Sequence, residues 1–138
     1  MKLLPSKRGR KSGTIKVLIV DDSEAVKSSL SAFVAGLPGL EVVGTAADGV
    51  EALALVAACQ PELVLMDLSM PVMDGLQALQ LIHQRHPVTR VIMMTVCEGA
   101  EVEARCLAGG ADAFLTKQRV CKNLAETVLK LFPKRNLK

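Results

Sequence analysis

The chain has 138 residues, half of them hydrophobic, which suits one domain with a packed core and excludes a disordered chain. The chain contains three Phe and no Tyr or Trp, which argues against a surface on which the bases of single-stranded nucleic acid stack. The net charge of +3 comes from the two ends, because residues 17–132 hold eight basic and fourteen acidic residues. We therefore expect an acidic domain at 15–132, a basic N-terminal tail at 1–14, and a basic C-terminal tail or linker start at 133–138.

The cysteines and the N-terminus indicate a cytoplasmic protein. The four cysteines contain no CxxC pair and do not resemble a secreted disulfide framework. The first residues carry no apolar run of the kind found in signal peptides. No apolar run reaches the length of about 18 residues that a membrane span needs, so we expect no membrane partner.

Short apolar runs alternate with amphipathic stretches along the chain. The run at 16–20 predicts a strand covered on both faces, and apolar residues at helical spacing follow from 26 to 37. A strand at 41–45 precedes a helix over 50–57, and a wholly apolar strand at 63–66 precedes a helix over 75–86. A strand at 91–94, a helix at 100–108, a short strand at 113–115 and a helix at 120–131 complete the pattern.

Five such βα units predict an α/β fold with a doubly wound, five-stranded parallel sheet and five helices on its two faces. In open sheets of this kind, ligands bind outside the carboxyl ends of the strands, where the strand order reverses. The residues directly after each apolar run are therefore the candidates for a functional site.

Polar side chains with matching chemistry follow four of these strands. Asp21 and Asp22 follow the first strand, Asp67 the third, Thr95 the fourth and Lys117 the fifth. Crowded carboxylates repel one another unless a cation neutralises them, and Mg²⁺ prefers oxygen ligands. A carboxylate in such a site can attack phosphorus, and phosphoryl transfer needs mainly positioning and charge neutralisation. Each residue alone could be a helix cap, a turn or a surface residue, but their expected convergence favours a phosphoryl-transfer site.

Four segments carry these residues, namely Val-Asp21-Asp22-Ser, Met-Asp67-Leu-Ser-Met-Pro-Val-Met-Asp-Gly75, Met-Met-Thr95 and Ala-Gly-Gly-Ala-Asp-Ala-Phe114-Leu-Thr-Lys117. Together they resemble the receiver domain of two-component response regulators. The resemblance covers about 15–132, nearly the whole chain. It implies the flavodoxin-like, CheY-like (βα)5 sandwich.

The resemblance also implies roles for individual residues. Asp67 matches the phospho-acceptor, and Asp22 and Asp67 match direct Mg²⁺ ligands. The Ser69 backbone carbonyl matches a third ligand, while Asp21 would act through metal-bound water.

Further positions match the part of the family that holds and senses the phosphoryl group. Thr95 and Lys117 match the residues that hold the phosphoryl oxygens, and with Asp67 they form the expected catalytic set. Phe114 matches an aromatic switch residue whose ring turns inward as the threonine moves, which would remodel the face of the fourth and fifth helices. That face is also the expected surface of a homodimer. Cys97, two residues after Thr95, is a candidate for tuning the phosphate lifetime.

Two details refine the resemblance. Gln118 stands where many receivers have proline, so a cis peptide bond after Lys117 is not expected. A lysine followed by a residue other than proline, together with the helix pattern after Thr95, resembles receivers of the NarL type, which usually precede a DNA-binding domain. The Asp-Asp-Ser and Pro-Val-Met-Asp-Gly segments also resemble receivers of chemotaxis methylesterases. The chain would be either a stand-alone receiver or part of a longer response regulator, with DNA contact only through an output domain that this sequence does not contain.

We therefore expect a signalling protein, not an enzyme, whose Asp67 accepts a phosphoryl group from a histidine kinase or a phosphotransfer protein. One alternative is a pseudo-receiver that signals through protein contacts alone. A second is a DNA-associated protein that acts through its basic tails, although no recognition helix supports it.

Overall fold

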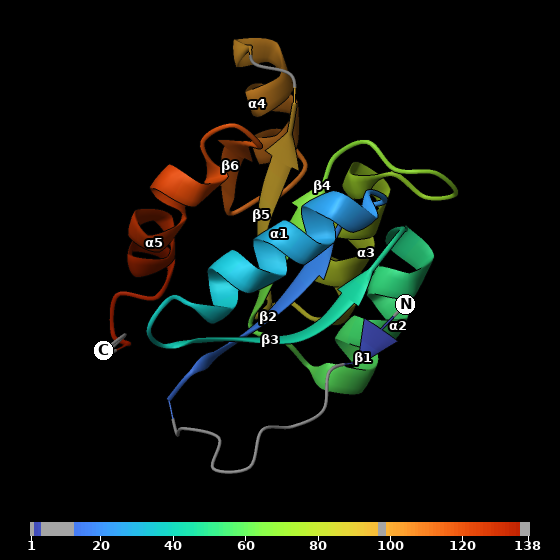
Figure 1. Ribbon diagram of the computed structural model, residues 1–138. Helices are drawn as coiled ribbons and strands as arrows, with labels where there is room; N and C mark the ends of the chain where they lie inside the picture. Colours follow the sequence, from blue (N-terminus) through green and yellow to red (C-terminus); the bar gives the residue numbers. More distant parts are fainter. Residues whose placement is uncertain (1, 4–12, 97–98, 136–138) are drawn as a thin grey trace.

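The computed structural model describes residues 2–3, 13–96 and 99–135, which form a single sheet with helices on both faces (Figure 1). The strands are β1 (Lys2–Leu3), β2 (Ile15–Val20), β3 (Leu40–Ala46), β4 (Leu63–Asp67), β5 (Arg90–Thr95) and β6 (Ala113–Thr116). The helices are α1 (Glu24–Ala35), α2 (Gly49–Cys59), α3 (Gly75–Arg85), α4 (Ala100–Ala108) and α5 (Val120–Leu131).

The strand order is β1-β3-β2-β4-β5-β6, and the five strands from β2 to β6 are parallel. The predicted α/β fold with five parallel strands and five helices is therefore confirmed. The chain moves outward from β2 to β3 and then crosses to β4 on the other side of β2. The order thus reverses between β2 and β4, and the carboxyl ends of these two strands form the predicted switch point.

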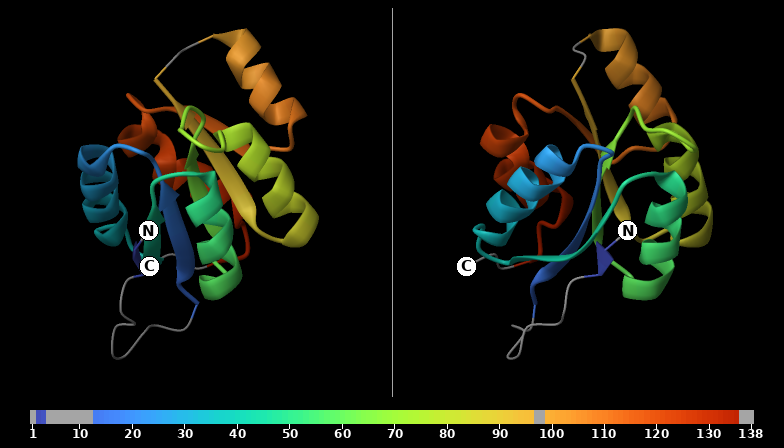
Figure 2. Two further views of the ribbon diagram at one scale, coloured as in Figure 1. Left: turned by 90° about the vertical axis from the view of Figure 1, so that its right-hand side faces the viewer. Right: turned by 45° about the vertical axis from the view of Figure 1, so that its right-hand side comes forward.

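Two apolar clusters cover the two faces of the sheet. One packs α1 and α5 against the sheet, and the other packs α2, α3 and the buried Cys106 of α4 against the opposite face (Figure 2). Successive residues of β2 alternate between the clusters, with Ile19 in the first and Leu18 in the second. A strand covered on both faces needs apolar residues on both, which explains the unbroken apolar runs at 17–20 in β2 and at 63–66 in β4.

The sheet contains one strand that the sequence pattern did not predict. Lys2 and Leu3 pair antiparallel with Thr45 and Gly44 at the outer edge of β3. A strand of two residues is too short to leave an alternating apolar pattern, so periodicity cannot detect it. Its pairing covers part of an edge that would otherwise expose unpaired backbone groups.

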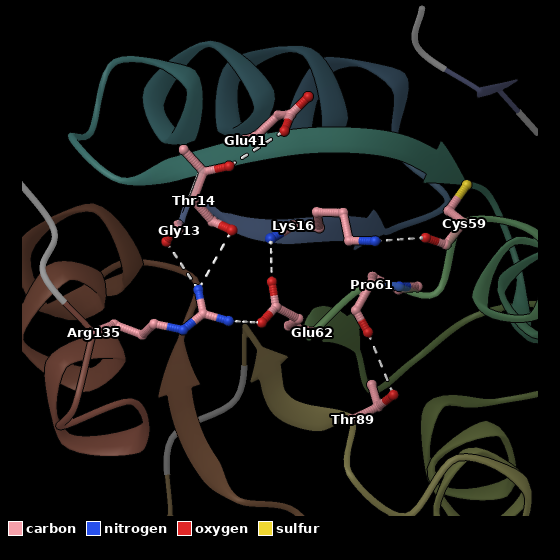
Figure 3. A network of polar contacts seen from close by, with 9 residues as sticks. All are labelled: Gly13, Thr14, Lys16, Glu41, Cys59, Pro61, Glu62, Thr89 and Arg135. Atoms are coloured by element: carbon pink, nitrogen blue, oxygen red, sulfur yellow. Dashed lines mark hydrogen bonds and ion pairs between the residues drawn. The ribbon is translucent and has the colours of Figure 1, made fainter. Parts of the chain in front are cut away.

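A polar network joins both ends of the domain at the amino ends of the strands (Figure 3). The Arg135 guanidinium donates hydrogen bonds to the carbonyl oxygens of Gly13 (2.9 Å) and Thr14 (3.4 Å) and forms an ion pair with Glu62. Glu62 in turn accepts a hydrogen bond from the backbone N–H of Lys16 at 3.3 Å. Arg135 therefore ties the segment after α5 to the sheet, at the edge opposite the candidate site.

Within residues 2–3, 13–96 and 99–135, each helix is too short or too polar to span a membrane.

Candidate functional site

Three carboxylates meet at the carboxyl ends of β2 and β4. Asp21 directly follows β2 and is fully buried, Asp22 is exposed, and Asp67 ends β4 with only 3% of its surface accessible. One oxygen from each of the three lies within 4.8 Å of the others. The structure thus brings together the acidic residues that the strand pattern placed at one edge of the sheet.

Local hydrogen bonds fix the two carboxylates that follow the strands. The Ser23 N–H donates to Asp21 Oδ1 at 2.9 Å, and the Ser23 hydroxyl oxygen accepts from the Val26 N–H at 3.2 Å. Ser23 is therefore the N-cap of α1, so Asp22 does not have the capping role that was its ordinary alternative. The Ser69 N–H donates to Asp67 Oδ1 at 3.3 Å, which orients the third carboxylate.

Lys117 is the cation that contacts this cluster. Its Nζ lies 2.7 Å from Asp21 Oδ2 and 3.3 Å from Asp67 Oδ1, and 19% of its side chain is exposed. The Lys117 N–H donates to the Thr95 carbonyl oxygen at 2.7 Å, which ties the end of β6 to the end of β5. Although burial opposes the charge of Lys117, the hydrogen bond to Asp21 and the two nearby carboxylates raise its pKa.

The charges of the cluster do not balance. Burial and the negative charge of Asp21 raise the pKa of Asp67 from 3.8 to about 6, although Lys117 acts in the opposite direction. One ammonium group cannot neutralise three carboxylates, and Asp22 is exposed to solvent. A set of three carboxylates with a net negative charge fits a hard divalent cation such as Mg²⁺, which prefers oxygen ligands and keeps several waters.

A pocket of about 550 Å³ opens over the cluster. Asp22, Asp67, Ser69, Thr95 and Lys117 line it, so five of the predicted residues face a common space. Thr95 ends β5 and is 4% exposed. The pocket is large enough for a small phosphorylated compound or a single side chain of a partner protein.

Phe114, the expected switch residue, lies in β6, the strand that ends just before Lys117. It pairs with Met93 of β5 and is partly buried against the apolar cluster that packs α2, α3 and α4 against the sheet.

Two other expectations concern the ends of β5 and β6. No peptide bond in residues 13–96 and 99–135 is cis, in agreement with the expectation drawn from Gln118. Cys97, the candidate for tuning the phosphate lifetime, lies outside the described residues.

The loop from β4 to α3 approaches the site closely, and a glycine makes this approach possible. A Cβ atom at Gly75 would collide with the Asp67 carbonyl oxygen and lie 2.9 Å from Leu68 Cα. Asp74 caps α3, because its carboxylate accepts from the Gln77 N–H at 2.9 Å. The Asp-Gly pair therefore supplies the N-cap and the first residue of α3.

Other residues of the pocket were missed by the sequence analysis. Leu76 from α3 and Val102 and Arg105 from α4 line the side formed by these two helices. Their helical spacing indicates only which faces of α3 and α4 are apolar. No local signal shows that these two helices border the acidic cluster.

The sequence matches the family described as response regulator receiver domain over residues 17–129. The chain belongs to this family.

The receiver domain is similar to several known proteins. A protein-glutamate methylesterase/protein-glutamine glutaminase of Geobacillus kaustophilus is 47% identical over 105 residues, which is 75% of this chain and 30% of that protein. The receiver domain of the NarL response regulator of Mycobacterium tuberculosis is 28% identical with a TM-score of 0.81, covering 88% of this chain and 98% of the other. A CheX-CheY-BeF3-Mg²⁺ complex of Borrelia burgdorferi contains a chain that is 31% identical, with a TM-score of 0.79 and coverage of 86% and 89%.

One expectation is wrong. We expected a protein that is not an enzyme, but the methylesterase relative is named as an enzyme. The conclusion came from the receiver domain alone, and this chain spans less than a third of that relative's length. A receiver domain is therefore no argument against enzymatic activity of a protein that contains it.

Proposed function

We propose that this receiver domain accepts a phosphoryl group on Asp67 in a Mg²⁺-dependent reaction and switches conformation in response. The observation that carries the proposal is the buried Asp67 carboxylate, which lies beside Asp21 and the Lys117 ammonium and opens to a pocket. Membership of the family supports the same function.

The acidic cluster would hold the metal ion. Asp22 and Asp67 would bind Mg²⁺ directly together with the Ser69 backbone carbonyl, and Asp21 would bind through a water molecule. When bound, Mg²⁺ supplies the positive charge that the cluster lacks and neutralises phosphoryl oxygens. The complex of Borrelia burgdorferi carries Mg²⁺ in its name, which supports this assignment for the present chain.

The protein's own residues position the reaction. Asp67 is the nucleophile, and the Ser69 N–H holds one of its oxygens in place. The Lys117 ammonium is already 3.3 Å from Asp67, where it can bind an oxygen of the incoming phosphoryl group. Thr95 lines the same pocket and can donate its hydroxyl proton to another phosphoryl oxygen.

Phosphorylation would bias the packing of the β6 region. Phe114 is partly buried, and we assign its ring a second arrangement that is turned further inward. Movement of Thr95 toward the phosphoryl group would make room for the inward arrangement. The surface formed by α4 and α5 would change with it and is the surface we assign to a homodimer.

A histidine kinase or a phosphotransfer protein would donate the phosphoryl group in the cytoplasm. The output is proposed to come from a partner or from another region of a longer protein. The methylesterase relative and a similar transcriptional regulatory protein, YhcZ of Bacillus subtilis, provide two candidate classes, an enzymatic output and a transcriptional output.

Intact-protein mass spectrometry after incubation with acetyl phosphate and Mg²⁺ tests the proposal. We expect the wild type to gain one phosphoryl group, and the Asp67→Asn variant to gain none. Omission of Mg²⁺ should abolish the gain in the wild type. A wild-type protein that stays unmodified with small-molecule donors and with histidine kinases would refute the proposal and favour the pseudo-receiver.

A further inference from the structure

The pocket has a second side that the proposed phosphoryl chemistry does not use. Asp67, Thr95 and Lys117 lie at the strand ends, whereas Leu76, Val102 and Arg105 come from α3 and α4. We call these last three residues the α3–α4 subsite. It contains an aliphatic surface and one guanidinium group.

The position of Arg105 follows from the packing of α4. Arg105 and Val102 are three residues apart and therefore share one face of the helix. The C-terminal end of α4 lies close to α3, because a Cβ at Gly109 would be 3.2 Å from Leu76 Cδ2. The buried Cys106 anchors the helix to the sheet, while Arg105 is exposed. Arg105 lines the pocket, and it forms no ion pair with another residue of 13–96 and 99–135.

Phosphoryl transfer releases the leaving group of the donor on the side of the phosphorus opposite the nucleophile. With acetyl phosphate, an Asp67 oxygen forms a bond to phosphorus while the bond from phosphorus to the bridging oxygen breaks. The electron pair of the broken bond stays on the bridging oxygen, and acetate leaves without needing a proton. Because the attacking and leaving oxygens lie roughly in line, acetate must form on the side of the pocket remote from Asp67.

We propose that the α3–α4 subsite binds the leaving group of acyl phosphate donors, with Arg105 binding its oxygens. A guanidinium group matches a carboxylate in charge and in planar geometry. Leu76 and Val102 provide an aliphatic surface for the methyl group. Lys117 and Thr95 would bind the oxygens of the transferred phosphoryl group, as in the proposed function. This inference rests on the proposed function of Asp67.

The test compares two donors that differ in the leaving group. Acetyl phosphate releases acetate, whereas phosphoramidate releases ammonia when its P–N bond breaks and so offers nothing for a guanidinium group to bind. We expect Arg105→Ala to slow phosphorylation by acetyl phosphate about fivefold, as for the loss of one solvent-accessible charge contact. Phosphorylation by phosphoramidate should keep its wild-type rate, and Arg105→Lys should recover part of the rate with acetyl phosphate.

Arg85→Ala is the matched control, because Arg85 is an exposed arginine at the end of α3 and does not line the pocket. Its rates with both donors should equal those of the wild type. Unchanged rates for Arg105→Ala would overturn the inference, as would an equal loss with both donors, which would indicate a general effect of charge or folding. A wild type that reacts with neither donor would also overturn this inference, and one that stays unmodified with histidine kinases as well would refute the proposed function of Asp67.

Discussion

Replacing Asp67 by Asn is expected to stabilise the metal-free protein at neutral pH. The amide keeps the size of the carboxyl group, and its oxygen can still accept the hydrogen bond from the Ser69 N–H. What the substitution removes is a negative charge that is buried and lies beside Asp21. The gain should therefore depend on pH, because it exists only where Asp67 is ionised.

The magnitude follows from the pKa of Asp67, which the fold raises from 3.8 to about 6. Between these two values the native state binds more protons than the unfolded state, so the free energy of unfolding falls as pH rises. The loss of stability caused by ionising this buried carboxylate is absent at a pH well below 3.8 and complete at a pH above about 6. Linkage gives a cost of about 1 kcal/mol at about pH 4.5 and about 3 kcal/mol at about pH 7.5.

Urea denaturation of the wild type and Asp67→Asn, at both pH values and with a chelator present, measures this effect. The difference in free energy of unfolding should grow by about 2 kcal/mol from the lower to the higher pH. Any pH-independent effect of the amide cancels in that comparison. Glu126→Gln is the control, because Glu126 is exposed on α5 and should show almost no change with pH. A difference that is the same at both pH values would refute the raised pKa of Asp67.

Three further predictions concern the metal, the loop after β4 and the polar network of Figure 3. Mg²⁺ should raise the melting temperature of the wild type, because the ion binds the carboxylates of the folded protein and not the unfolded chain. It should raise the melting temperature of Asp22→Asn much less, and equal shifts would contradict the assignment of Asp22 as a ligand. Val72→Asn should stabilise the protein by about 1 kcal/mol in urea denaturation. Val72 is 82% exposed and has a φ of 68°, a backbone conformation that suits Asn better than a β-branched residue. A loss of stability would show that the substitution relieves no strain. Glu62→Ala should cost about 1–2 kcal/mol, because it removes the acceptor for Arg135 and for the Lys16 N–H. A double-mutant cycle with Arg135→Ala measures the coupling between the two side chains, and additive effects would exclude it.

The sequence determined the sheet and the edge at which the functional residues lie. The run at 63–66 is apolar at every position because β4 is covered on both faces, so its pattern identified both the strand and its burial. Asp67 follows that run directly. Since carboxyl ends of parallel strands share one edge, its proximity to Asp21 and Lys117 could be inferred without coordinates.

The tertiary structure decided how these residues contact one another. Asp21 is buried and bound to Lys117 while its neighbour Asp22 is exposed, and no pattern in the sequence distinguishes the two. Arg105 borders the pocket because α4 packs beside α3, and Arg135 meets Glu62 across 73 residues of chain. Periodicity records which face of an element is buried. It does not record which distant element covers that face or where a long polar side chain ends, because those depend on packing across the whole domain.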